Sequence, residues 1–277
     1  MAAVYGLAGE VTSWTNNTGL ISGAVKPSQV AWNISADEGD VTAFEGANTP
    51  TVVAEYISGL RNATGTITSY LTPAIYGTEG LVTAASSANY TANSKSWSMT
   101  ISIDEADSTA FGATGVEFRS FIPGLYRWNG QFVCNTDDST ALTLPGQPKE
   151  TLTFKYIDAG GAGDDVDFAL SGSAFVQNLG TNSTPTAIAE STFAFRGSGQ
   201  LSSAGSDGSR TPLFPVGAAG VAEAISGFSA GELVTILTDG TTLTADAFPT
   251  SIAITVDPNS PIQVVTNFRA SGTITVS

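Results

Sequence analysis

The chain has 277 residues, of which 42% are hydrophobic and 13% charged, so it can bury a core and is not a disordered polyanion. Its 25 acidic side chains outnumber its 10 basic ones, and the net charge of −15 argues against sequence-specific binding of nucleic acid. The chain has no histidine, so it lacks the commonest general base and the commonest transition-metal ligand, which argues against hydrolytic chemistry.

The amino-terminal residues carry no signal for secretion. Residues 1–6 lack a basic region and an apolar run, and no later stretch approaches the roughly 18 apolar residues of a membrane span. We therefore expect a soluble protein, made in the cytoplasm, with no membrane partner. The single cysteine, Cys134, cannot form an intramolecular disulfide and has no histidine to activate it, so it is interpreted as a strand residue.

A first sequence element occurs twice, about 65 residues apart. The first copy comprises residues 32–34 (WNI), 37–44 (DEGDVTAF) and 56–60 (YISGL), and the second comprises residues 97–99 (WSM), 104–111 (DEADSTAF) and 121–125 (FIPGL). Gly65 and Gly130 follow the two Gly-Leu pairs at the same distance. We expect structurally equivalent positions at Trp32, Asp40, Thr42, Phe44, Gly59 and Leu60, and at Trp97, Asp107, Thr109, Phe111, Gly124 and Leu125.

A second element also occurs twice, at residues 195–201 (FRGSGQL) and at residues 268–274 (FRASGTI). Its matched positions are Phe195, Arg196 and Gly199 in the first copy, and Phe268, Arg269 and Gly272 in the second. An arginine at the same place in both copies predicts a shared structural role, such as pairing with a carboxylate of a neighbouring subunit.

The order of the four copies is not that of a simple tandem duplication. The two copies of the first element precede the two copies of the second, which predicts that one module is inserted into the other. Residues 1–76 plus 202–277 would then form one discontinuous module, and residues 77–201 the inserted one. Two sequential modules that exchange strands are an alternative.

Residues 64–70, 96–103, 151–156 and 251–256 alternate apolar with small polar side chains, which predicts half-buried β-strands. Residues 158–165 and 202–215 are rich in Gly, Ser, Asp and Pro and are predicted to form turns and loops. Residues 218–229 are the best stretch for a short helix. The predicted fold is all-β, with two sandwich or barrel modules and at most short helices.

Two groups of acidic residues could be taken for calcium-binding sites, but their spacing does not support this. The acidic residues do not follow the spacing of an EF-hand and are interpreted as solvated acidic loops. They are Asp37, Glu38, Asp40 and Glu45 in one copy, and Asp104, Glu105 and Asp107 in the other. The run at residues 160–165 (GGAGDD) occurs once and is interpreted as a hairpin turn. We predict no catalytic residue, metal site or cofactor, and expect the four tryptophans to pack in the core rather than against sugars.

The first element resembles the tail-tube proteins of long-tailed bacteriophages, most clearly over residues 40–67 and 107–132. The second element looks like the closing strand of the same family. The resemblance implies a structural protein, not an enzyme, whose β modules form six-fold rings that stack into a tube. Because the elements occur twice here, three chains with two modules each would supply the six positions, and six chains are the alternative.

From this resemblance we expect a major tail tube subunit located in the virion tail and assembled in the host cytoplasm. Its partners would be itself and other tail proteins, such as the tape measure and the tail terminator, while viral DNA would pass through without specific binding. Acidic side chains should outnumber basic ones on the lumen wall, because a basic wall would trap phosphates. The alternative function is an Ig-like module that decorates a virion or binds a host as an adhesin.

Overall fold

The computed structural model is an all-β protein, as the alternating segments predict. It describes residues 9–17, 20–21, 25–40, 56–71, 82–84, 94–109, 118–136, 145–157, 166–184, 186–204, 223–224, 229–237, 239–257 and 260–277, and these ranges contain strands and no α-helix. The strands are β1 (Glu10–Trp14), β2 (Val25–Asp40), β3 (Tyr56–Leu71), β4 (Val82–Ala84), β5 (Ser94–Asp107), β6 (Phe121–Asn135), β7 (Glu150–Ile157), β8 (Val166–Asn182), β9 (Glu190–Ala204), β10 (Glu223–Ala224), β11 (Gly231–Ile236), β12 (Thr242–Asp257) and β13 (Ser260–Val276).

The four segments with period-two alternation lie in β3, β5, β7 and β12. In β5, Trp97, Met99 and Ile101 are buried, whereas Ser98 and Thr100 between them are partly exposed. Successive side chains of a strand point to opposite faces, so one face of β5 meets the core and the other meets solvent. The prediction of half-buried strands is confirmed.

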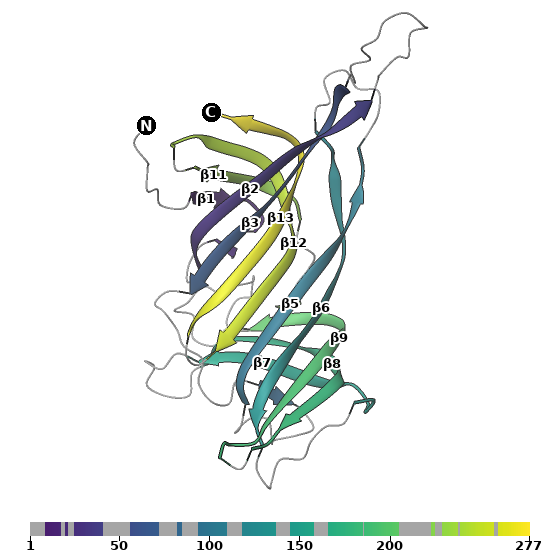
Figure 1. Ribbon diagram of the computed structural model, residues 1–277, viewed down its shortest axis with the longest axis vertical. Coiled ribbons are helices and arrows are strands. Elements are labelled where there is room, and N and C mark those ends of the chain that lie inside the picture. Colours follow the sequence, from purple (N-terminus) through teal and green to yellow (C-terminus); the bar gives the residue numbers. More distant parts are fainter. Residues whose placement is uncertain are drawn as a thin grey trace, which may run out of the picture.

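The strands form one antiparallel network with two sets of six (Figure 1). The first strand group is ordered β2-β3-β13-β12-β11-β1, and the second strand group is ordered β5-β6-β9-β8-β7-β4. Strand β12 pairs with β5 and thereby joins the two groups into one sheet, and the short β10 pairs with β9. The first group therefore takes its strands from both ends of the chain and the second from the middle.

The two strand groups share their hydrogen-bonding register. In the first group Phe268 pairs with Gly65 on one side and with Pro249 on the other. In the second group Phe195 pairs with Gly130 and with Val176. The register irregularities of the β12·β13 pair, at residues 245–247 and 249–251, recur in the β8·β9 pair at residues 172–174 and 176–178. Since bulges re-aim side chains locally, matched bulges place matched side chains alike in both groups.

Each group turns back on itself, so that short strands cover the core face of the long ones. The indole nitrogen of Trp32 in β2 donates to Thr235 Oγ1 in β11 at 3.0 Å, and that of Trp97 in β5 donates to the Lys155 carbonyl in β7 at 2.8 Å. Aromatic side chains dominate the core between these layers, as expected from the area that each buries. The largest fully buried ones are Trp14, Trp97, Trp128, Phe132, Phe154, Phe193, Phe195, Phe248 and Phe268.

The structure corrects the assignment of the acidic residues to loops. Asp37 and Glu38 belong to β2, and Asp104, Glu105 and Asp107 belong to β5, where β2·β3 and β5·β6 run on as two-stranded ribbons. Figure 1 shows these ribbon ends projecting beyond the other strands. Both faces of such a ribbon meet water, so acidic side chains are tolerated within paired strands.

Three other local predictions have mixed outcomes. Residues 223–224, expected within a short helix, form strand β10 and pair with Ser202 and Ser203 of β9. Residues 202–204, expected in a loop, are the end of β9. The predicted turns at residues 158–165 and 205–215 lie outside the described residues.

Candidate functional site

The repeated phenylalanines lie against the repeated glycines in both groups. A Cβ atom added to Gly65 would lie 2.3 Å from Phe268 Cζ, and one added to Gly130 would lie 2.8 Å from Phe195 Cζ. Phe268 and Phe195 are 1% exposed, so each ring occupies space that only glycine leaves free on the adjacent strand. The matching of Phe195 with Phe268 in the second element thus has a packing explanation.

Gly199 and Gly272 have φ angles of 90° and 84°, in the left-handed region that favours glycine. They occupy matching positions inside the register irregularities of β9 and β13, and the Gly199 carbonyl accepts a bond of 3.1 Å from the Trp128 indole. Glycine allows the positive φ angle that the backbone needs within each irregular segment, which accounts for the recurrence of these two residues in the sequence.

Gly59 and Gly124 lie close to an aspartate of the neighbouring strand in the two acidic ribbons. A Cβ atom on Gly59 would lie 3.1 Å from the Asp37 Cβ, and one on Gly124 would lie 3.5 Å from the Asp104 Cβ. The backbones of Asp40 and Asp107 pair with the corresponding first residues of β3 and β6. Leu60 is partly buried whereas Leu125 is 79% exposed, so these two matched positions differ in surroundings.

The two repeated tryptophans are offset by two residues in register. Trp32 pairs with Gly65, but the residue that pairs with the matching Gly130 is Met99, and Trp97 pairs with Phe132. A shift of two residues keeps a side chain on the same face, so both indoles still reach the short strands across the core. Thr42, Phe44 and Phe111, the other predicted repeat positions, lie outside the described residues.

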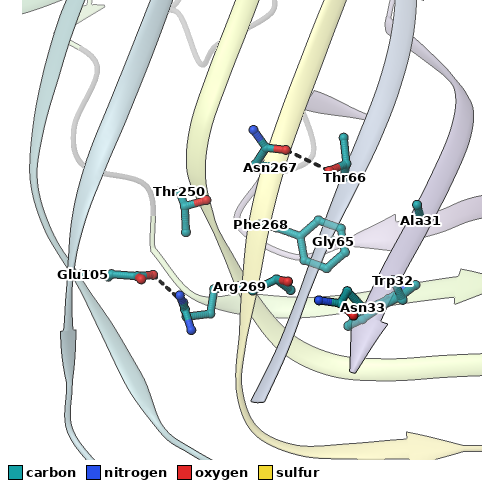
Figure 2. Close-up of a pocket in the computed structure, with 11 residues that line it drawn as sticks. Ala31, Trp32, Asn33, Gly65, Thr66, Glu105, Thr250, Asn267, Phe268 and Arg269 are labelled. Carbon is teal, nitrogen blue, oxygen red and sulfur yellow. Dashed lines mark hydrogen bonds and ion pairs between the residues drawn. The ribbon is translucent and has the colours of Figure 1, made fainter. Parts of the chain in front are cut away.

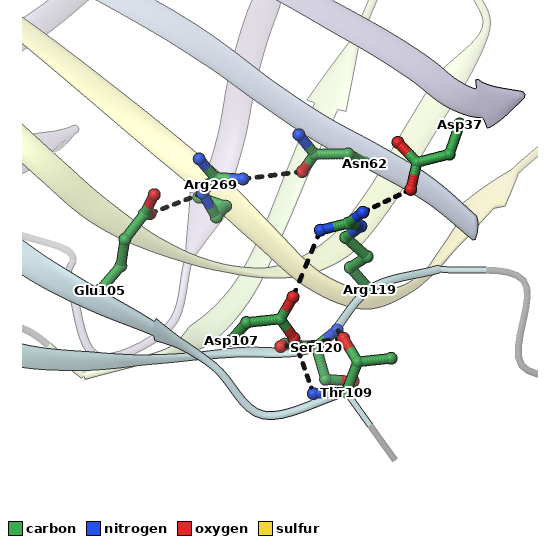
Figure 3. A network of polar contacts seen from close by, with 8 residues as sticks. All are labelled: Asp37, Asn62, Glu105, Asp107, Thr109, Arg119, Ser120 and Arg269. Atoms are coloured by element: carbon green, nitrogen blue, oxygen red, sulfur yellow. Dashed lines mark hydrogen bonds and ion pairs between the residues drawn. The ribbon is translucent and has the colours of Figure 1, made fainter. Parts of the chain in front are cut away.

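Arg269 bridges the two strand groups (Figure 3). From β13 it donates through Nε to Glu105 of β5 at 2.5 Å and through Nη1 to Asn62 of β3 at 2.8 Å. Its guanidinium also lies 4.3 Å from the ring centroid of Phe121. The side chain is 18% exposed, so this contact is better shielded from solvent than an ordinary surface ion pair. The arginine of the first group thus pairs with a carboxylate of the second.

Arg119 joins the two ribbons at the same junction. It pairs with Asp37 of β2 and, at 3.3 Å, with Asp107 of β5. The Asp37 partner raises the pKa of the Arg119 guanidinium, and hydrogen bonds from Thr109 hold the pKa of the Asp107 carboxyl below its usual value. Thr109 also accepts from the Ser120 amide, which links the residues just after β5 to the residue just before β6 (Figure 3).

Arg196, the counterpart of Arg269, has different surroundings. It lies on β9 opposite Phe175, as Arg269 lies opposite Phe248, but it is exposed and forms no ion pair with any residue that the structure describes. Glu38, the counterpart of Glu105 by register, is also exposed and lacks a cationic partner within the described ranges. At matching places, therefore, the second group carries a cation and the first an anion that have no ion-pair partner among the described residues.

A hollow of about 360 Å³ lies over β2, β3 and β13 on the face away from the core (Figure 2). Thr66 donates to Asn267 within it at 2.8 Å, and the Arg269–Glu105 pair forms its border. Threonine and asparagine side chains make up five of its eleven lining residues, and the hollow brings together no nucleophile and base.

The described residues hold no group of three or more His, Cys, Asp and Glu side chains arranged to bind a metal ion. Cys134 lies in β6, as predicted, and is fully buried; burial raises the pKa of its thiol to about 12. Such a thiol stays protonated and unreactive at neutral pH.

Within the described ranges, no helix is long and apolar enough to cross a membrane.

Sequence reasoning missed Arg119 and Asn62. Arg119 lies between the repeated stretches, and its partner Asp37 is 82 residues away in the other strand group. Asn62 follows the first copy of the first element, but its match after the second copy is Arg127, which pairs instead with Asp104 at 2.5 Å. Residues that join two repeats need not recur in both, so the repeat pattern carries no signal for them.

Comparisons of the chain with protein-family models, with curated proteins and with solved structures find no match.

Proposed function

We propose that this chain is a structural subunit of a bacteriophage tail tube, which polymerises into stacked rings and forms a conduit for DNA ejection. The observation that carries the proposal is the duplicated strand group whose copies are already joined edge to edge by β12 and β5. Such a joint can be repeated between chains, which is what a ring of β modules requires. The resemblance of residues 40–67 and 107–132 to tail-tube proteins points the same way.

The two strand groups are the two modules of this proposal. The first takes strands from residues 10–71 and 231–276, and the second takes strands from residues 82–204, in keeping with one module inserted in the other. Three chains would then supply six modules to each ring, and six chains of one tube-forming module each are the alternative. No catalysis is proposed, because the chain has no histidine and its one thiol is buried.

The solvent face of the joined sheet is the surface proposed to line the conduit. Along β5 and β6 this face carries Ser98, Thr100, Asn129 and Gln131, which alternate with buried residues. Two of its cations are neutralised, since carboxylates pair with Arg127 and Arg269. A neutral polar wall with few free cations releases few counterions from DNA and so lets it slide. The expectation that acidic side chains outnumber basic ones on the lumen wall stays a prediction.

Negative-stain electron microscopy of the purified protein, at rising concentration, tests the proposal. We expect hollow cylinders of stacked rings, with other tail proteins such as the tape measure and tail terminator needed only to set length and ends. A protein that remains monomeric or forms one small closed oligomer would contradict the tube. It would favour the alternative of an Ig-like decoration module or host-binding adhesin.

A further inference from the structure

The pairing of β12 with β5 joins the two strand groups inside the chain. Each of these two edges has a counterpart in the other group, on β8 and on β2, that pairs with no further strand in the described part of the chain. At the joint, residues 251–256 of β12 pair with residues 97–102 of β5 in six consecutive antiparallel pairs, from Ser251 with Ser102 to Val256 with Trp97. The matched registers identify residues 178–183, in and just after β8, as the counterpart of the β12 segment, and residues 30–35 of β2 as the counterpart of the β5 segment.

Neither counterpart edge is paired in the described part of the chain. Residues 178–182 of β8 pair with β9 alone, and residues 30–35 of β2 pair with β3 alone. At the internal joint the core-facing side chains Ile101 and Ile252 are 0% exposed. Their counterparts are Ile34, which is 46% exposed, and Leu179, which is partly exposed.

Within the two segments the edges lack the features by which proteins block edge strands, and the nearest register shifts lie beside them, at residues 27–29, 36–38 and 176–178. Open edges are commonly protected by charged side chains, proline or bulges. Residues 30–35 (VAWNIS) and 178–183 (NLGTNS) contain no charged residue and no proline, and no register shift interrupts the pairing of either segment on its inner side. Both segments are therefore suited to accept a further strand.

We propose that β8 of one chain pairs with β2 of a second copy in the register of the internal joint, so that Gly180 lies opposite Asn33 of the next chain. Leu179 then lies opposite Ile34 and completes an apolar cross-strand pair. The two surfaces differ, so the contact is head-to-tail and extends the sheet from chain to chain until a ring closes. The inference rests on the proposed self-assembly and specifies its contact.

The charges of Arg196 and Glu38, which have no ion-pair partner in the part of the chain that the structure describes, support the same register. Arg269 reaches across the internal joint to Glu105. Arg196 and Glu38 are their counterparts, and in the proposed contact Arg196 reaches Glu38 of the next chain across an equivalent joint. The exposed cation of the second group and the exposed anion of the first group thereby neutralise each other.

Cysteine cross-linking of the full-length protein tests the register. The double variant G180C/N33C, oxidised after assembly, should give a ladder of covalent oligomers on a non-reducing gel that ends at three chains. The buried Cys134 leaves this chemistry undisturbed. In the shifted control G180C/S35C, one cysteine moves by about 7 Å along the strand, beyond disulfide reach, and the ladder should be lost. The variant A253C/T100C places the same pair at the internal joint and should close within one chain.

Charge reversal provides a second readout that needs no cysteine. R196E should reduce assembly at low salt, and adding E38R should restore it, because the two changes exchange the charges of the proposed pair. Val276 is 64% exposed and away from both edges, so V276E is the matched surface control and should assemble normally. Failure of E38R to rescue R196E would contradict the proposed ion pair.

The outcomes separate this inference from the proposed function. Cylinders in the microscope without a G180C/N33C ladder, while A253C/T100C does cross-link, would overturn the register and leave the tube intact. A ladder of three chains without stacked cylinders would support the edge contact and contradict the tube. A chain that stays monomeric at high concentration and gives no ladder would overturn both.

Discussion

The two strand groups are built alike, and yet the same position is core in one and surface in the other. Ile101 in β5 and Ile34 in β2 have matching partners in β6 and β3. Ile101 is 0% exposed because β12 lies along its strand, whereas Ile34 is 46% exposed because no described strand covers the same edge of β2. Burial at this position is thus decided by the neighbouring strand rather than by the residue.

Substitution of these two isoleucines measures the difference directly. We expect Ile101→Ala to lower the free energy of unfolding by about 2–5 kcal/mol, because it leaves a cavity in a closed core. In the unassembled chain Ile34→Ala should cost less than about 1 kcal/mol, as for other exposed positions. Urea unfolding at low protein concentration gives both values. Equal losses would mean that the edge of β2 is already covered within one chain.

The paired glycines should respond alike in the two groups. A Cβ atom on Gly65 would lie 2.4 Å from the Ala31 carbonyl oxygen, and one on Gly130 would lie 2.0 Å from the Ser98 carbonyl oxygen. Gly65→Ala and Gly130→Ala should each cost about 1–3 kcal/mol through overpacking. Gly180→Ala, with nothing within 4 Å of the added atom, is the control and should change stability by less than about 0.5 kcal/mol. Sensitivity at only one of the paired glycines would contradict the structural equivalence.

Substitution of the two matched arginines, Arg269 and Arg196, should change the stability of the chain by different amounts. Arg269→Gln removes a shielded ion pair and the contact with the Phe121 ring, so we expect a loss of about 1 kcal/mol that shrinks as salt is added. Arg196→Gln should leave the stability of the unassembled chain unchanged. Thermal unfolding at low and high salt compares them, and a similar loss from both would show that Arg196 has a partner within its own chain.

The smallest expected difference between the two strand groups concerns how readily a small buried side chain becomes accessible to a reagent. Cys134 is 0% exposed and its register counterpart in the first group, Ser69, is 2% exposed. With the pKa of Cys134 raised to about 12, only about one thiol in ten thousand is ionised at pH 8. A thiol reagent should therefore not label the native protein, and should label one site after denaturation. The cysteine of the double variant S69C/C134S should be equally protected, and its rapid labelling would show that the first group opens more readily.

Much of the fold could be predicted because its signals are local. Alternation in residues 96–103 and 251–256 marks strands whichever partners they find. The recurrence of Phe195 and Phe268, and of Gly199 and Gly272, reflects packing and backbone requirements that are met within each copy. The acidic stretches were assigned wrongly to loops, because polar composition favours loops but does not exclude a solvated two-stranded ribbon.

What the sequence determined by itself was an all-β chain with two matched sets of positions, since strand periodicity and repeated residues are visible without partners. Only the tertiary structure decided the exact correspondence of Trp32 with Met99, because a two-residue shift keeps every side chain on its face and leaves the alternation unchanged. It also decided that Arg269 is paired while Arg196 is exposed. These differences depend on which strand edge meets which, and edge contacts between distant segments leave no local pattern in a sequence.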